Sequence, residues 1–162
     1  MENKISITGV LRWRVLSSDG SVVVDGVNHN IVTHQGDALI ADIMADTPAR
    51  AKVNNANGVI AVGTGWTGTT PKNNTAVNTA TGAPQGMEAT YPRLKGAFGA
   101  ADDNVVQYRA VFSAGSLNVS GIDEVSLGNG TDNLAYAEIT PNVNVGIGDT
   151  LQVDWEITFL GA

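Results

Sequence analysis

The stretch LQVDWEITF, residues 151–159, decides the fold of this chain. Large apolar residues occupy every second position, and the residues between them are polar or charged. Successive side chains of a β-strand point to opposite faces, so this alternation predicts a strand with one buried and one exposed face. The residues that we expect to face inward are Leu151, Val153, Trp155, Ile157 and Phe159.

The same period of two recurs elsewhere. Residues 4–16 alternate, the turn residues 17–20 (SSDG) follow and valines 22–24 begin a return strand, which predicts a hairpin over residues 4–28. Further strands are expected over residues 58–63, 105–112, 122–127 and 134–140. This spacing predicts a mainly β protein, an antiparallel β-sandwich or small barrel of about seven or eight strands.

One short α-helix is expected near residues 35–46. Thr33 precedes it as a candidate N-cap, and Asp37 lies where the positive end of the helix dipole favours a carboxylate. Apolar residues recur at three- and four-residue spacing through residues 39–44, so the helix needs a partner surface. We expect it to cover one end or side of the sheet.

The sequence predicts a single β-rich domain over residues 1–162 with a long polar loop at 64–90. The tract TGWTGTTPKNNTAVNTATGAPQG, residues 64–86, carries almost no charge and little hydrophobic periodicity. Compact domains rarely carry so long a connection without a use for it. The loop is therefore expected to be mobile or to be ordered by contact with another molecule.

Composition excludes several classes of function. The net charge is −7, and no run of Lys and Arg exists, which argues against nucleic-acid binding. The absence of cysteine excludes disulfides and thiolate metal sites. No signal peptide and no apolar stretch of membrane-spanning length is present, so a soluble protein made in a cytoplasm, with no membrane partner, is expected.

Gly63, Gly65 and Gly68 form a G-x-G-x-x-G, the spacing that cradles a pyrophosphate in dinucleotide-binding folds. That chemistry needs a helix to open at the loop, and residues 69–74 are poor in helix formers. We therefore expect a flexible or tightly turning loop and no cofactor.

No catalytic or metal-binding constellation stands out. His29, His34 and Asp37 could make a metal site only if the backbone folded sharply, and we expect them to be dispersed. The adjacent carboxylates Asp123 and Glu124 are interpreted as residues of a turn or a solvated face. The prediction is a protein that is not an enzyme, with no catalytic, cofactor-binding or metal-binding residues.

The order of several motifs resembles small structural proteins of tailed bacteriophages. The resemblance covers most of the chain from residue 30 onward and is carried by residues 30–37 (NIVTHQGD), 39–41 (LIA), 60–65 (IAVGTG), Arg93, 108–112 (YRAVF), 121–127 (GIDEVSL) and 149–159 (DTLQVDWEITF). Proteins of this kind are capsid decoration (cement) proteins or components of tail fibres and baseplates. The resemblance implies a virion location, homo-oligomeric assembly as a trimer, the major capsid protein as partner, and no catalysis. The alternative is a tail-fibre or baseplate component that acts as an adaptor or binds host-surface glycans.

Two segments are the expected partner contacts, the N-terminal residues and the polar loop. Trp66 is prominent because an aromatic side chain in an uncharged loop should be covered, either by its own domain or by a neighbour. The predicted contact residues are Met1, Glu2, Asn3, Lys4, Trp66, Thr67, Thr69, Thr70, Lys72, Asn73 and Asn74.

Overall fold

The computed structural model describes residues 6–45, 50–69 and 72–160. Nine strands and one helix occur in this part of the chain. In chain order they are β1 (Ser6–Leu16), β2 (Val22–Val32), α1 (His34–Met44), β3 (Val59–Gly63), β4 (Ala80–Gly86), β5 (Arg93–Leu94), β6 (Val105–Phe112), β7 (Val119–Gly128), β8 (Asn133–Val145) and β9 (Thr150–Leu160).

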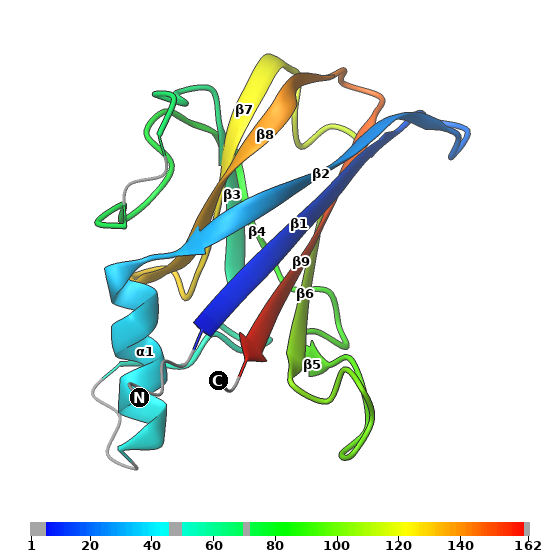
Figure 1. Cartoon of the computed structure of the whole chain (residues 1–162). Helices are drawn as coiled ribbons and strands as arrows, with labels where there is room; N and C mark the ends of the chain where they lie inside the picture. Colours follow the sequence, from blue (N-terminus) through cyan, green and yellow to red (C-terminus); the bar gives the residue numbers. More distant parts are fainter. Residues whose placement is uncertain (1–5, 46–49, 70–71, 161–162) are drawn as a thin grey trace.

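The strands form one curled antiparallel sheet in the order β4-β3-β7-β8-β2-β1-β9-β6-β5 (Figure 1). The prediction of a mainly β protein with one short helix is confirmed. The sheet is hydrogen-bonded continuously from β4 to β5, so the chain forms a half-barrel of nine strands and not a sandwich of two separate sheets. The curl brings its ends together, because the backbone N–H of Glu88, just after β4, donates to the carbonyl of Arg109 on β6 (2.9 Å).

Alternation in β1 and β9 builds the centre of the core. The two strands pair with Leu11 opposite Trp155 and Trp13 opposite Val153, and all four side chains are buried. The indole N–H of Trp13 donates to Asn28 Oδ1 on β2 (2.8 Å), so this buried polar group has a partner. The predicted inward face of residues 151–157 is therefore confirmed, whereas Phe159 at the strand end is only partly buried.

The hairpin predicted over residues 4–28 is present as β1 and β2. Gly20 has a φ of +82°, the left-handed conformation that Asp-Gly turns favour. The Asp19 carboxylate accepts hydrogen bonds from the Ser17 hydroxyl and the Ser21 backbone N–H. These bonds, that of Ser17 first, lower the pKa of Asp19 to about 2.

Helix α1 begins one residue earlier than predicted and ends at Met44. Thr33 is its N-cap, as predicted, because its hydroxyl oxygen accepts from the Gly36 backbone N–H (3.1 Å). The helix packs on β8 so closely that a Cβ at Gly36 would lie 2.2 Å from the carbonyl oxygen of Leu134. It therefore covers one end of the curled sheet (Figure 1).

The second half of the tract predicted as loop is a strand. β4 pairs with β3 along the edge of the sheet, with Val59 opposite Gly86 and Val62 opposite Thr81. Its side chains are exposed or partly exposed, so neither face of the strand needs apolar residues. The sequence therefore lacks the alternation that would predict a strand here.

Candidate partner-binding surfaces

The connection between β3 and β4, residues 64–79, covers the outer face of the neighbouring strands β7 and β8. Residues 124–128 of β7 and 133–137 of β8 are buried without alternation, because the inner face meets the core and the outer face meets this loop. The loop is therefore ordered by its own sheet, and the expectation that it is mobile or ordered by another molecule is wrong for its described residues.

The loop is held by a carboxylate that lies beneath it. Glu124 is fully buried, and its Oε1 accepts from the backbone N–H groups of Gly65 (3.0 Å) and Thr79 (2.8 Å). Its Oε2 accepts from the N–H of Asn78 (2.9 Å) and from the Tyr136 hydroxyl (2.5 Å). A buried carboxylate is costly unless it is hydrogen-bonded in this way. The prediction that Glu124 lies in a turn or on a solvated face is wrong.

Burial of Tyr136 and its hydrogen bond to Glu124 raise the pKa of the phenol above its ordinary value. The hydroxyl is therefore a donor at every physiological pH, and the carboxylate keeps its fourth partner. Four donors from two segments distant in sequence converge on one side chain, so the arrangement serves to fix the loop.

The glycine motif serves the same carboxylate. A Cβ at Gly63 would lie 2.4 Å from Glu124 Oε1, and one at Gly65 would lie 2.5 Å from Thr79 Oγ1. Gly68 adopts a φ of +83°. The loop thus wraps an anion that belongs to the protein, and no helix opens after it in the described residues.

Trp66 is covered largely by its own chain. Its ring lies on that of Tyr136, with centroids 5.7 Å apart, and its backbone N–H donates to Asp123 Oδ1 (3.0 Å). The indole is partly buried, so a fraction of it remains at the surface.

The other predicted contact residues divide into three groups. Asn74 is buried, its side-chain amide hydrogen-bonded to that of Asn133, so it is structural. Lys72 pairs with Asp37 on α1 (2.7 Å) and joins the loop to the helix. The exposed residues are Thr67, Thr69 and Asn73. Met1, Glu2, Asn3, Lys4 and Thr70 lie outside the described residues.

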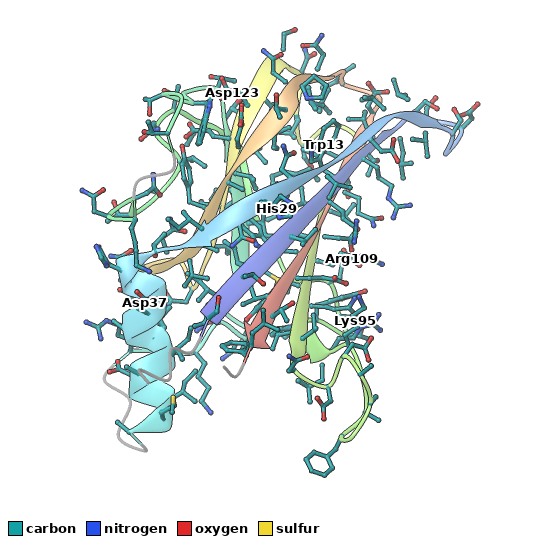
Figure 2. The ribbon with its side chains drawn as sticks, viewed as in Figure 1. Trp13, His29, Asp37, Lys95, Arg109 and Asp123 are labelled. Carbon is teal, nitrogen blue, oxygen red and sulfur yellow. The ribbon has the colours of Figure 1, made fainter. Side chains whose placement is uncertain are left out.

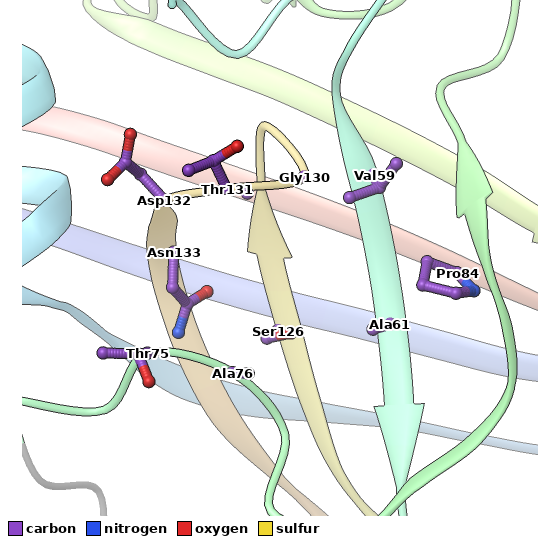
Figure 3. A pocket seen from close by; sticks show the side chains of 11 residues that line it. Val59, Ala61, Thr75, Ala76, Pro84, Ser126, Gly130, Thr131, Asp132 and Asn133 are labelled. Atoms are coloured by element: carbon purple, nitrogen blue, oxygen red, sulfur yellow. The ribbon is translucent and has the colours of Figure 1, made fainter. Parts of the chain in front are cut away.

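A pocket of about 160 Å³ lies between this loop and the sheet (Figure 3). Val59 and Ala61 of β3 and Ser126 of β7 form its floor, and Thr75 and Ala76 come from the loop. Pro84 of β4 and the β7–β8 turn, residues 128–133, complete the wall. Its one charged lining residue, Asp132, is 3.8 Å from Arg50, so the pocket suits a small, mainly apolar group.

The outer face of β1, β9 and β6 is covered by no other described segment and carries a ladder of charges. Asp154 on β9 lies between Arg12 and Arg109 in register, and it pairs with Arg109 at 2.5 Å. Two residues further along β9, the Glu156 carboxylate accepts a hydrogen bond from the Gln107 side-chain amide (2.8 Å) and forms an ion pair with Lys95 (3.1 Å). Figure 2 shows Arg109 and Lys95 on this side of the molecule.

Tyr91 extends this face beyond β6. The guanidinium groups of Arg93 and Arg109 lie over its ring, 4.6 Å and 5.0 Å from the centroid. Five of the nine Lys and Arg residues therefore gather on one face, where Asp154 and Glu156 on β9 oppose them together with Asp25, the residue opposite Arg14 on β2. We call this surface the basic face; it consists of Arg12, Arg14, Arg93, Lys95 and Arg109 with those three carboxylates. Five cations and three carboxylates give it a local charge of +2, whereas the whole chain carries −7.

A second exposed feature is Phe98, in the connection between β5 and β6, residues 95–104. Its side chain is 101% exposed, the highest value among the exposed large apolar residues. Neither Phe98 nor the basic face was predicted from the sequence. The signal for Phe98 was a phenylalanine within a Gly- and Ala-rich turn, and the basic face becomes visible only when strand order is known.

The candidate metal residues are dispersed. His34 is exposed at the start of α1, and Asp37 pairs with Lys72. His29 is exposed on β2, well apart from Asp37 (Figure 2). Among the residues that the structure describes, no three His, Asp or Glu side chains are grouped to hold a metal ion. Helix α1, the one helix in the described ranges, lacks the length and hydrophobicity needed to cross a bilayer.

No protein-family model matches this chain, and neither a curated protein nor a solved structure shows significant similarity to it.

Proposed function

We propose that this chain is a non-catalytic structural protein of a phage virion, a homo-oligomeric decoration protein that binds the major capsid protein. The order of motifs that resembles phage structural proteins supports the class of protein. The outer face of β1, β9 and β6 supports the mode of binding, because an ordered sheet face that no described segment covers suits contact with another protein.

The observation that carries the proposal is the basic face. Ion pairs hold Lys95 on Glu156 and Arg109 on Asp154, so these two side chains lose little conformational freedom when a partner binds. A positive patch on a negative protein also orients it toward an acidic partner surface. In this proposal the basic face meets an acidic patch on the capsid shell.

A second candidate function is a tail or baseplate adaptor that binds host-surface glycans, and the pocket of Figure 3 favours it. The pocket is small; its floor combines apolar Val59 and Ala61 with the Ser126 hydroxyl, and Thr131 and Asn133 add a hydroxyl and an amide group at its wall. Such a lining suits the acetyl group of an N-acetylated sugar, whose methyl group is apolar and whose amide forms hydrogen bonds.

Co-sedimentation with undecorated capsids tests the first proposal. The double variant Arg12→Gln/Arg14→Gln lowers the charge of the basic face by two. The matched variant Thr67→Glu/Thr69→Glu lowers the net charge by the same amount, but on the loop that the sequence predicts as the contact. We expect saturable binding by wild type, at least tenfold weaker binding by the arginine variant, and little change for the loop variant.

Three results would contradict the proposal in different ways. Loss of binding in the loop variant alone would place the contact on the loop. Equal loss in both variants would indicate a response to net charge and not to a defined surface. Absence of binding by wild type, together with saturable binding to N-acetylated glycans that Ser126→Leu abolishes, would favour the adaptor.

A further inference from the structure

The turn that carries Phe98 presents an apolar side chain to solvent on a well-ordered backbone. The backbone N–H of Ala100 donates to the Ala97 carbonyl (2.9 Å), and that of Gly99 donates to Asp103 Oδ2 (2.7 Å). These bonds hold the turn in a shape that keeps the phenyl ring away from its own core. A fully exposed phenyl ring is unfavourable in water, and enclosure by a partner surface relieves that cost.

An apolar groove of about 450 Å³ lies beside α1, where β1 begins and β9 ends. Its apolar lining residues are Ile7, Ile40, Ala41, Met44, Phe159 and Leu160. Met44 is 74% exposed and Leu160 is 43% exposed, so much apolar surface faces solvent there. A hollow of about 180 Å³ adjoins the groove and shares Ile40 and Phe159 with it.

The turn and the groove are complementary in charge. Asp102 and Asp103 lie in the same connection as Phe98, and one of them orders its turn. Asp37 is the charged residue that lines the groove, and its pairing with Lys72 (2.7 Å) offsets its charge; Lys52 lines the adjoining hollow. A turn with an apolar centre and an acidic flank therefore matches an apolar groove whose acid is offset by Lys72 and whose adjoining hollow presents the Lys52 ammonium.

The two features cannot meet within one molecule. In Figure 1 the connection between β5 and β6 lies at the lower right and α1 at the lower left, at the same end of the curled sheet but on opposite sides. A contact between different patches of identical chains is heterologous, and it closes into a ring when the rotation between neighbours permits. Two patches at one level of the molecule and on opposite sides suit such a ring.

We infer that Phe98 of one copy occupies the groove beside α1 of a second copy, and that repetition of this contact builds the oligomer. The inference deepens the proposed function, because it assigns the self-association of the decoration protein to named residues. The basic face takes no part in this contact and stays available to the capsid.

Four variants test the inference by sedimentation velocity over a range of protein concentrations. Phe98→Ser removes the inserted side chain, and Ala41→Glu places a carboxylate in the groove while keeping a good helix former at an exposed position. Ile147→Ser is the control for Phe98, since Ile147 is also exposed, at 61%, on the β8–β9 turn at the other end of the sheet. Ala41→Ser is the control for the groove.

Wild type and both controls are expected to form oligomers, whereas Phe98→Ser and Ala41→Glu are expected to be monomeric with an unchanged far-UV circular dichroism spectrum. The decisive measurement is an equimolar mixture of these two variants. The Ala41→Glu chain keeps an intact Phe98 and the Phe98→Ser chain keeps an intact groove, so the mixture should contain a dimer of one chain of each kind.

A mixture that stays monomeric would overturn the inference, as would a wild type that is monomeric at every concentration. If deletion of residues 1–5 turned a monomeric wild type into an oligomer, the groove would belong to the chain's own N-terminal residues and the inference would be wrong. A monomeric wild type that still sediments with capsids would leave the capsid-binding part of the proposed function intact and contradict its homo-oligomeric part. An oligomer that ignores capsids would contradict the proposed function and support this contact.

Discussion

At the scale of single residues, Glu124 has the largest structural role outside the core. It is a buried charge whose four hydrogen bonds hold the β3–β4 loop on the sheet. Glu124→Gln keeps the shape but replaces one accepting oxygen with an N–H donor that faces other donors. Since a hydrogen bond to a buried charged group contributes about 1.5–3 kcal/mol, we expect the free energy of unfolding to fall by about 2–3 kcal/mol in urea titrations.

Asp123→Asn is the matched control, because Asp123 is the adjacent carboxylate and accepts a single backbone hydrogen bond from Trp66. Asp123→Asn should lower the free energy of unfolding by about 1 kcal/mol or less. Amide hydrogen exchange adds a local measurement: protection at Gly65, Asn78 and Thr79 should fall in Glu124→Gln and stay unchanged in Asp123→Asn. Equal stability of the two variants would show that the loop does not depend on the buried charge.

Sequence alone could not identify Glu124 as buried. Its donors come from residues near 65 and 78, about fifty positions away, and a carboxylate in a strand is most often solvated. The glycines Gly63 and Gly65 were visible, but the spacing that lets a backbone wrap a phosphate also lets it wrap a carboxylate. Which anion is wrapped depends on tertiary structure.

At the scale of elements, the packing of α1 on β8 depends on glycine at position 36, which has no side chain. In Gly36→Ala the new Cβ would meet the Leu134 carbonyl at 2.2 Å, so the helix must move off β8. Alanine improves helix propensity by about 1 kcal/mol, whereas overpacking costs about 1–3 kcal/mol. We expect a net loss of up to about 2 kcal/mol in the free energy of unfolding.

Gly86→Ala, at the end of β4, is the matched substitution, because a Cβ there meets nothing within 4 Å. It should be neutral or slightly stabilising, since alanine restricts the unfolded chain. If both variants kept wild-type stability in thermal unfolding, the close contact between α1 and β8 would not limit the position of the helix.

The charged residues on the outer face of β9 make the stability of the protein depend on pH. Burial alone would raise the pKa of Glu156, but hydrogen bonds from Gln107 and the Lys95 ammonium overcome this effect and hold the pKa below its ordinary value. A lowered pKa in the folded state means that the ladder stabilises the protein above that value and that this contribution is lost as the pH falls through the folded pKa. Glu156→Gln should cost at most about 1 kcal/mol at neutral pH, and the difference from wild type should vanish in strong acid.

Thr158→Ser, the next outward position on β9, is the control for this titration, and its difference from wild type should not vary with pH. A constant difference for Glu156→Gln at all pH values would mean that the side chain acts through packing and not through its charge.

Strands with one buried face were predictable, and the others were not. The alternation in residues 151–157 and in the first hairpin encodes the inner face of β9 and β1 directly, and the cap at Thr33 marks the start of α1. β4 and β5 lie at the two ends of the sheet with mostly exposed side chains, so no apolar period marks them. Their pairing depends on neighbours that are distant in sequence.

At the scale of the whole molecule, the proposals assign two kinds of association to two surfaces with different physics. The basic face would act on the capsid through charge, and the contact between Phe98 and the α1 groove would act through burial of apolar surface. Neither surface could be predicted from the sequence, because each combines residues from segments far apart in the chain. The strand order alone places Arg12 beside Asp154 and Arg109.

Salt should separate the two associations. Between about 0.01 M and about 1 M salt the Debye length falls from about 30 Å to about 3 Å, so attraction between exposed charges is largely screened. We expect sedimentation of the protein with capsids to weaken steadily with sodium chloride, whereas self-association of the free protein should hold or strengthen, because apolar burial does not depend on charge. If both associations weakened in parallel, a single charged surface would serve both. The assignment of capsid binding to the basic face and of self-association to Phe98 would then be wrong.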